Sequence, residues 1–197
     1  MKKLISVFVL LIAVAAYAAD KEQIALGAKA PEFNLVNAVD GKNVTMKADD
    51  GVLKVVIFSC NQCPYAKAFE PRIIEVAKQY QPKGVRFYVL DPNDDTKYPE
   101  ETLENMKARA VEKGYPFPYL KDGDSSIARA YGARVTPHVF VVDGKGTVRY
   151  RGYVDDSAKP AERQTTGLTD ALTMLLDGRE VANADTRAFG CTIKWKT

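Results

Sequence analysis

The sequence predicts an α/β domain in which helices flank a central mixed β-sheet, with an N-terminal β-hairpin and a C-terminal tail. Two apolar runs, 52–58 and 85–90, have the composition of strands that are buried on both faces. Between them, residues 64–80 repeat apolar side chains at intervals of three and four, which is typical of an amphipathic helix. A strand, a helix and a strand in this order place the two strands parallel in one sheet. The chain has 197 residues, 46% of them hydrophobic, which is enough for one compact core.

The N-terminal hairpin and a second helix follow from turn and stop signals. Strands at 30–36 and 42–46 flank an Asp-Gly turn. A helix begins at Pro99 and is stopped by Gly114. Its expected inner face is formed by Leu103, Met106 and Ala110.

The C-terminal half contains a short helix, a second hairpin and a last helix. The short helix is expected at 125–131, and strands at 139–142 and 147–152 flank a turn rich in glycine. The last helix is expected from 166 to 177, and the tail after it has no strong periodicity. The inward residues of the last helix are expected to be Leu168, Leu172, Leu175 and Leu176.

The N-terminus has the pattern of a secretory signal peptide. A basic start at 1–3 precedes an apolar stretch at 4–16 and a small-residue cleavage pattern at 16–18. We therefore assign residues 1–19 to a signal peptide and 20–197 to the folded domain, and expect an exported protein, periplasmic or secreted. The alternative is a membrane anchor, but the apolar stretch is short for a bilayer span, so no stable membrane insertion is expected after cleavage.

The charge pattern argues against a nucleic-acid partner. The formal net charge is +3, and removal of the signal peptide takes away Lys2 and Lys3. The remaining basic residues are interspersed with acidic ones, without the basic patch that nucleic-acid binding requires.

Two cysteines stand where the first buried strand ends and the first helix begins. Cys60 and Cys63 are separated by two residues, and the sequence predicts that Cys60 lies at the helix N-terminus, where the dipole favours a thiolate. Such a pair can attack a disulfide with one thiol and resolve the mixed disulfide with the other. A structural disulfide would close only a very short loop, which stabilises little. A zinc site would need two further ligands, and the chain has one histidine and one other cysteine.

A proline next to a later strand supports the redox interpretation. Thr136 and Pro137 precede the apolar run at 139–142. A cis-proline at this position would bring backbone against the sulfurs without adding a competing donor. An ordinary trans-proline at a strand start is the alternative.

These motifs resemble the thioredoxin superfamily and, more narrowly, the peroxiredoxin-like redoxins near the alkyl hydroperoxide reductase and thiol-specific antioxidant group. The matching segments are FSCNQCPY at 58–65, NMKA at 105–108, YPFPYL at 115–120, AYG at 130–132, YRGYVDD at 150–156 and GCTIKWK at 190–196. The resemblance implies a thioredoxin-like fold for the whole domain. It also implies Cys60 as nucleophile, Cys63 as resolving thiol and Pro137 as the cis-proline. The expected function is a thiol-disulfide oxidoreductase that acts on protein or small-molecule disulfides or thiols with a redox partner protein, without a cofactor.

The chain departs from the thioredoxin pattern beside the first thiol. Ser59 replaces the usual tryptophan, and Lys54 stands near the place of the buried acid that carries protons. Asp91, at the end of the next strand, is the candidate replacement and is also a candidate substrate contact, together with Thr136.

A thiol peroxidase is an alternative function that the resemblance suggests. Peroxiredoxins place a threonine three residues before the peroxidatic cysteine. If Cys63 took that role, Cys60 would stand at the threonine position.

The third thiol, Cys191, has two open interpretations. The tail can fold back so that Cys191 forms or exchanges a disulfide with Cys60 or Cys63, as a resolving or regulatory thiol. Alternatively, Cys191 is a small buried residue that packs beside Trp195.

The single histidine gives a further alternative outside enzymology. His138 follows the predicted cis-proline, so it is expected near the thiols, as a third substrate-contact candidate. Two thiolates and an imidazole would suit Cu(I), which makes a copper carrier that uses Cys60, Cys63 and His138 the alternative. A strand-edge histidine without a metal is favoured.

Overall fold

The computed structural model describes residues 23–197. The predicted signal peptide at 1–19 lies outside the described residues. The strands are β1 (Phe33–Asn37), β2 (Asn43–Met46), β3 (Lys54–Phe58), β4 (Arg86–Asp91), β5 (Tyr119–Lys121), β6 (Val135–Thr136), β7 (His138–Val142), β8 (Val148–Gly152) and β9 (Cys191–Thr192). The α-helices are α1 (Pro64–Tyr80), α2 (Leu103–Lys113), α3 (Ser126–Tyr131) and α4 (Gly167–Leu176), with short 3-10 helices η1 (Gln81–Lys83), η2 (Pro99–Glu101) and η3 (Pro160–Glu162).

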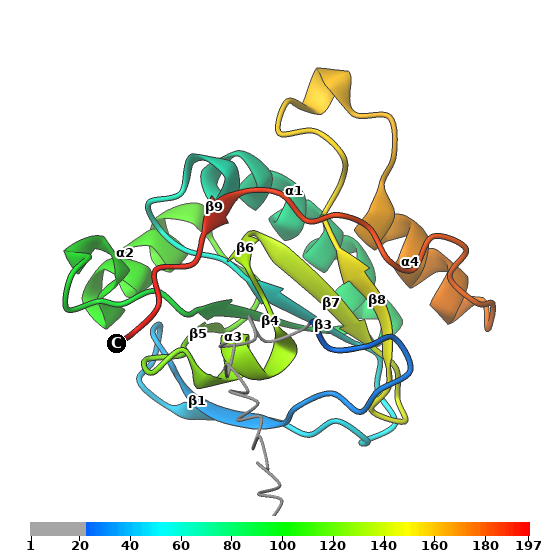
Figure 1. Ribbon diagram of the computed structural model, residues 1–197, viewed down its shortest axis with the longest axis horizontal. Coiled ribbons are helices and arrows are strands. Elements are labelled where there is room, and N and C mark those ends of the chain that lie inside the picture. Colours follow the sequence, from blue (N-terminus) through cyan, green and yellow to red (C-terminus); the bar gives the residue numbers. More distant parts are fainter. Residues whose placement is uncertain (1–22) are drawn as a thin grey trace, which may run out of the picture.

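A mixed sheet of seven strands forms the centre of the molecule, in the order β2-β1-β5-β4-β3-β7-β8 (Figure 1). Strands β3, β4 and β5 are parallel, as the strand-helix-strand unit predicts. Strand β7 runs antiparallel to β3 and pairs with β8, and the N-terminal hairpin joins the other edge through β1 and β5. The predicted fold class and the two hairpins are therefore confirmed.

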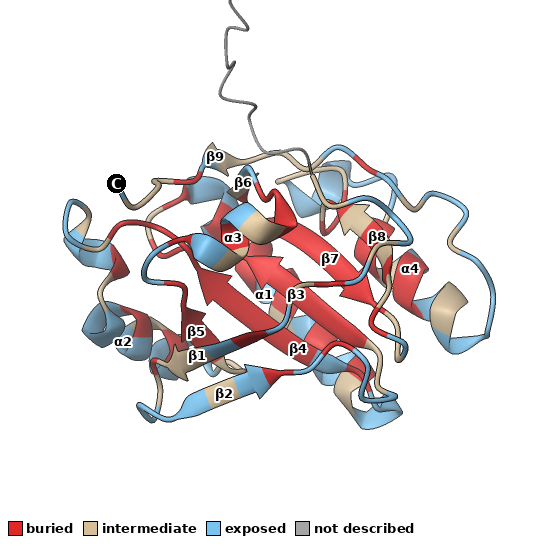
Figure 2. Ribbon diagram, turned by 60° about the horizontal axis from the view of Figure 1, so that its bottom comes forward, coloured by how far each residue is buried: buried red, intermediate tan, exposed pale blue. Residues whose placement is uncertain are grey.

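Helices cover both faces of this sheet, and the side-chain alternation of the strands supplies one core to each. Along β3, Val55 and Ile57 face the core beneath α1, α2 and α4, while Val56 and Phe58 face the core that includes α3. All five residues of β3 are buried, as are all five of β7, because helices lie above and below them (Figure 2). This explains the uninterrupted apolar runs in the sequence.

Three short strands are absent from the predicted elements. Strand β5 has three residues and follows a proline-rich loop, and β6 and β9 have two residues each. Strands β6 and β9 pair with each other in a separate small sheet that carries the tail back over the molecule. Segments of two or three residues are too short to show a periodicity, so their pairing comes only from tertiary contacts.

Two leucines predicted to face inward are exposed. Leu103 and Leu176 each keep 41% of their surface accessible, because they occupy the first and last positions of α2 and α4, beyond the sheet. Met106, Ala110, Leu168 and Leu172 are buried as predicted. Within residues 23–197, no helix has the length and apolar character needed to cross a bilayer.

Candidate active site

The two neighbouring cysteines lie in the loop that joins the carboxyl end of β3 to α1. Strand β3 ends at Phe58, which pairs with His138 at the start of β7. This pairing brings the residue pair Thr136–Pro137, just before β7, against the loop, and the peptide bond between them is cis. The thiol loop after β3 and the proline segment before β7 therefore lie against each other at the same end of the sheet.

Cys63 occupies the N-cap position of α1. Its sulfur accepts a hydrogen bond from the backbone N–H of Ala66, at 3.4 Å, and Pro64 fills the first helical position. The Thr136 carbonyl oxygen lies 3.2 Å from the Cys63 sulfur and accepts from the protonated thiol. The prediction that Cys60 holds the helix N-terminus is therefore wrong, because α1 begins at Pro64 and its N-cap, which accepts from the Ala66 N–H, is Cys63.

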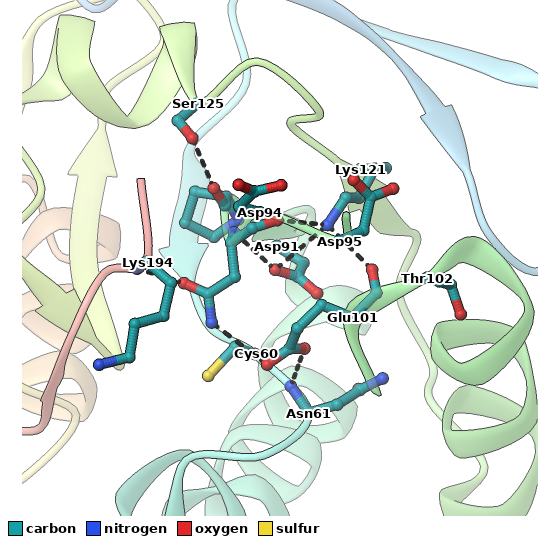
Figure 3. A network of polar contacts seen from close by, with 12 residues as sticks. Cys60, Asn61, Asp91, Asp94, Asp95, Glu101, Thr102, Lys121, Ser125 and Lys194 are labelled. Atoms are coloured by element: carbon teal, nitrogen blue, oxygen red, sulfur yellow. Dashed lines mark hydrogen bonds and ion pairs between the residues drawn. The ribbon is translucent and has the colours of Figure 1, made fainter. Parts of the chain in front are cut away.

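Cys60 faces a different environment. Its sulfur lies 3.1 Å from the Thr136 hydroxyl and is 4% exposed, and Cys63 is 2% exposed. Behind Cys60, the carboxylate of Glu101 accepts a hydrogen bond from the backbone N–H of Asn61 at 2.7 Å (Figure 3). It also accepts one from the backbone N–H of Gln62 at 3.3 Å. The two loop amides that follow Cys60 are thus occupied by a carboxylate.

The two environments shift the thiol pKa values in opposite directions. The hydrogen bond with Cys63, burial and the nearby Glu101 carboxylate raise the pKa of the Cys60 thiol. The pKa of Cys63 falls to about 4, chiefly because Cys60 donates to its thiolate, with help from the Cys191 thiol and the Ala66 N–H and against the effect of burial. The surroundings of Cys63, at the positive end of the helix dipole, therefore favour a thiolate more than those of Cys60 do.

The acidic network behind Cys60 extends to Asp91 at the end of β4. Burial raises the pKa of Asp91 well above its usual range, although the ammonium group of Lys121 lies 3.7 Å from Oδ1. Lys121 donates to the backbone carbonyls of Asn93 and Glu101, at 2.7 and 2.9 Å. Asp91 is completely inaccessible, so its prediction as a substrate contact is wrong, whereas its position beside the thiol loop suits a proton carrier.

The C-terminal tail covers the site. It runs back from α4 (red in Figure 1), and β9 pairs antiparallel with β6, so that Cys191 stands opposite Thr136. Cys191 packs against the cluster of Cys60, Cys63 and Ala66, and all three cysteines are free thiols in this structure. Burial and the neighbouring Cys63 raise the pKa of Cys191 to about 11. Cys191 and Trp195 pack against different clusters, Trp195 against the core on the α3 face of the sheet, so the alternative that packs Cys191 beside Trp195 does not describe its surroundings.

His138 is near the thiol loop in the sheet but does not join the thiols. Its ring packs on Phe140, with centroids 4.6 Å apart, while Nδ1 accepts from the Arg134 N–H at 3.3 Å and Nε2 lies 3.2 Å from Gln23. Burial lowers the pKa of His138 to about 3, so the imidazole is neutral. In the described part of the chain, no three His, Cys, Asp or Glu side chains are grouped so that they could hold a metal ion.

Several site residues are absent from the predicted set, namely Glu101, Lys121, Asn61 and Asn93. Glu101 lies 40 residues after Asn61, and the sequence around it indicates only a helix start. Lys121 belongs to the short strand β5, whose pairing with β4 aligns it with Asp91. Nothing in the local pattern distinguishes these residues from solvated charges.

The chain is similar to a known protein family and to several characterised relatives. Residues 26–151 match the model of the AhpC/TSA family. The thiol-disulfide oxidoreductase ResA of Bacillus anthracis is 30% identical over 130 residues, which span 66% of this chain and 70% of that protein. The thiol:disulfide interchange protein DsbE of Haemophilus influenzae is 27% identical over 146 residues, spanning 73% of this chain and 74% of that protein.

Two solved structures are similar over nearly the whole domain. An uncharacterized conserved protein from Geobacillus kaustophilus is 40% identical, with a TM-score of 0.82 over 87% of this chain and 93% of that one. A hypothetical protein from Sinorhizobium meliloti is 33% identical, with a TM-score of 0.81 over 89% of this chain and 97% of that one.

The fold and these matches define the class as a thioredoxin-superfamily oxidoreductase. Within that class, the chain belongs to the AhpC/TSA family. The predicted resemblance and the predicted enzyme class, a thiol-disulfide oxidoreductase, are thereby confirmed.

Proposed function

We propose that Cys60 and Cys63 form the redox-active pair of an exported thiol-disulfide oxidoreductase and that Cys63 supplies the attacking thiolate. The observation that carries the proposal is the opposite surroundings of the two sulfurs, with helix amides at Cys63 and a carboxylate behind Cys60. This exchanges the roles that the family resemblance implies, because nucleophilicity requires a thiolate and only Cys63 is placed to hold one near neutral pH.

In the reducing direction, the Cys63 thiolate attacks one sulfur of a substrate disulfide. A mixed disulfide with Cys63 forms, and the first substrate sulfur leaves as a thiolate. Cys60 then loses its proton and attacks the Cys63 sulfur, which closes the Cys60–Cys63 disulfide and releases the second substrate thiolate. The same steps in reverse oxidise a dithiol, so the direction follows from the potentials of the partners.

The proton of Cys60 needs an acceptor because its surroundings are buried. Asp91 and Glu101 provide a carboxyl pair on that side of the loop, and both act on Cys60 electrostatically. We assign proton transfer to this pair. Lys54, which stands near the usual place of the acid, donates instead to the carbonyls of Ala48 and Val52 at the opposite end of β3.

Thr136 and Pro137 line the site on the side that faces the two sulfurs. The Thr136 hydroxyl and carbonyl contact the sulfurs of Cys60 and Cys63, respectively. Pro137 adds no backbone donor that would compete for the sulfurs. The partners in this proposal are a protein or small-molecule disulfide or dithiol and a redox partner protein, without nucleic acid or a cofactor.

Export is supported by the N-terminal sequence pattern, with 1–19 as the signal peptide and 20–197 as the mature redoxin domain. Mass spectrometry of the mature protein from a periplasmic or culture fraction should give an N-terminus near residue 20. An intact Met1 in those fractions would contradict the assignment.

Turnover of a disulfide substrate in the presence of excess dithiol tests the redox proposal. Cys60→Ser and Cys63→Ser should each reduce the rate to background, since both sulfurs are needed to complete a cycle. The Cys60→Ser Cys191→Ser double variant should retain the mixed disulfide on Cys63, because Cys63 is then the one cysteine left in the chain and no internal thiol can resolve the bond. Undiminished disulfide turnover in either variant would contradict the proposal. Consumption of hydroperoxide by Cys60→Ser at the wild-type rate would favour the peroxidase alternative.

A further inference from the structure

The tail segment at 190–193 lies on the edge of β6 in the way that an extended peptide substrate would. Strand β9 pairs antiparallel with β6, in the register Val135 with Thr192 and Thr136 with Cys191, and the Ile193 N–H donates to the Arg134 carbonyl at 3.1 Å. An open strand edge beside a reactive group binds an extended chain through main-chain hydrogen bonds, and side chains fix the register. Here the chain itself supplies that peptide, and it carries a cysteine.

The register brings Cys191 to Cys63. Thr136 is the β-partner of Cys191, and the Thr136 carbonyl is also 3.2 Å from the Cys63 sulfur. The preceding residue is Gly190, where an added Cβ would lie 2.1 Å from the Thr136 carbonyl oxygen, so only glycine permits this close approach. The tail backbone therefore touches the proline segment directly, and Cys191 packs on the paired thiols.

Anchors on both sides hold Cys191 at this place. On one side, the ring of Phe189 lies edge-on to Phe69 and Tyr65 of α1, with centroids 5.5 and 6.0 Å away. On the other side, Ile193 is buried in the sheet core and the Lys194 N–H donates to Asn93 at 2.8 Å. A thiol tethered in this way has a high effective concentration toward its neighbour.

The three thiols differ in access to solvent. Cys60 and Cys63 are buried beneath the tail, whereas Cys191 is only partly buried. An external partner that approaches the site therefore meets Cys191 before it meets the paired thiols. This arrangement suits a thiol that passes a disulfide between the buried pair and the surface.

We propose, on the basis of the proposed function above, that Cys191 is a third redox-active thiol that exchanges with the Cys60–Cys63 disulfide through Cys63. Deprotonated Cys191 attacks the Cys63 sulfur, the Cys63–Cys191 bond forms and the Cys60–Cys63 bond breaks. Cys60 leaves as a thiolate and takes up the proton that Cys191 gave up, so the exchange needs no external oxidant or reductant. The thiol of an external partner then attacks Cys191, forms a mixed disulfide there and displaces the Cys63 thiolate.

The exchange is tested by mapping disulfides in serine variants equilibrated in a glutathione redox buffer. After alkylation of free thiols, trypsin separates peptide 55–67, which carries Cys60 and Cys63, from peptide 188–194, which carries Cys191. In Cys60→Ser, the two peptides should be found linked, in excess over glutathione adducts. In the matched control Cys63→Ser, the link should be roughly tenfold less abundant or lower, because Cys191 is positioned on Cys63.

The wild-type chain separates failure of this exchange from failure of the proposed function. Wild type should hold its main disulfide within peptide 55–67 and show the linked peptides as a minor acid-trapped species. If that disulfide and disulfide turnover are present but Cys60→Ser carries glutathione on Cys63 and a free Cys191, the exchange is refuted while the redox pair stands. Equal linkage in Cys60→Ser and Cys63→Ser would also refute it.

Discussion

The two sides of the thiol pair differ in the groups that they present to sulfur. On the β4 and η2 side, Cys60 meets the carboxylates of Glu101 and Asp91. On the α1 and β9 side, Cys63 meets a helix amide and a second thiol, that of Cys191. Two identical side chains three residues apart are thereby made unequal, because the surroundings raise the pKa of Cys60 and lower the pKa of Cys63.

On the β4 and η2 side, Glu101 raises the pKa of Cys60 partly through the loop backbone. Glu101 accepts from the amides of Asn61 and Gln62, which would otherwise be free to stabilise a charge on Cys60. The carboxylate both occupies these donors and adds a like charge, and each effect disfavours a Cys60 thiolate. The tail side contributes only donors and one carbonyl, that of Thr136, so the anion collects there.

The largest expected effect comes from detaching the tail side with Gly190→Ala. The added methyl group would collide with the Thr136 carbonyl, and steric overpacking of this kind costs about 1–3 kcal/mol. If the closed tail is destabilised by that amount, alkylation of Cys63 should be roughly fivefold to 150-fold faster. The alkylation rate of Cys63 is measured on the reduced protein by mass spectrometry.

The matched control for this change is Gly123→Ala, where an added methyl group approaches only the Lys121 Cγ, at 3.9 Å. Its alkylation rate should equal that of the wild type. An unchanged rate in Gly190→Ala would show that the tail does not shield the thiols.

A smaller effect is expected on the acidic side with Glu101→Gln. The amide oxygen still accepts from the loop N–H groups, but the negative charge is lost, so the pKa of Cys60 should fall by about one unit. The thiolate of Cys63 should remain. A thiolate titration of Glu101→Gln in a Cys63→Ser Cys191→Ser background isolates Cys60. A pKa equal to that of the Cys63→Ser Cys191→Ser protein without the Glu101 change would contradict the role of the carboxylate.

The smallest effect is expected from Phe189→Ala, which removes one anchor of the tail. Phe189 contacts Tyr65, Phe69 and Tyr153. Because the strand pairing still holds the tail, we expect loss of the ring to favour tail opening by about 1 kcal/mol, the size of one aromatic pair. Alkylation of Cys63 should accelerate several-fold, less than in Gly190→Ala, because the pairing of β9 with β6 persists. A larger acceleration than in Gly190→Ala would mean that the rings, and not the strand pairing, hold the tail.

The sequence contains enough information for the sheet, the long helices and the paired thiols, because these depend on periodic apolar patterns and on local spacing. It does not reveal which sulfur caps α1, although the predicted helix at 64–80 is confirmed, since the cap depends on how the loop at 59–63 turns into the helix. It also does not reveal Glu101 or the place of Cys191, because contacts across 40 or more residues leave no local signal. Cys191 is noticeable in the sequence only as an odd thiol.

The central claim, that Cys63 carries the thiolate, has a consequence for stability against pH. A pKa lowered from 9.0 to about 4 in the folded reduced chain means that this stabilisation is complete above pH 9.0 and is lost as the pH falls through about 4. Cys63→Ser should therefore lose stability relative to wild type at neutral pH and converge with it in acid. Denaturant unfolding of both reduced proteins across this range measures the difference.

The most direct measurement is a titration of thiolate ultraviolet absorbance in the reduced wild-type protein, with Cys63→Ser and Cys191→Ser beside it. One thiolate should persist from neutral pH down to about 4 in wild type, remain largely in Cys191→Ser and be absent at neutral pH in Cys63→Ser. A wild-type thiolate that appears only near the ordinary thiol pKa of about 8.5, or one that survives in Cys63→Ser, would contradict the claim.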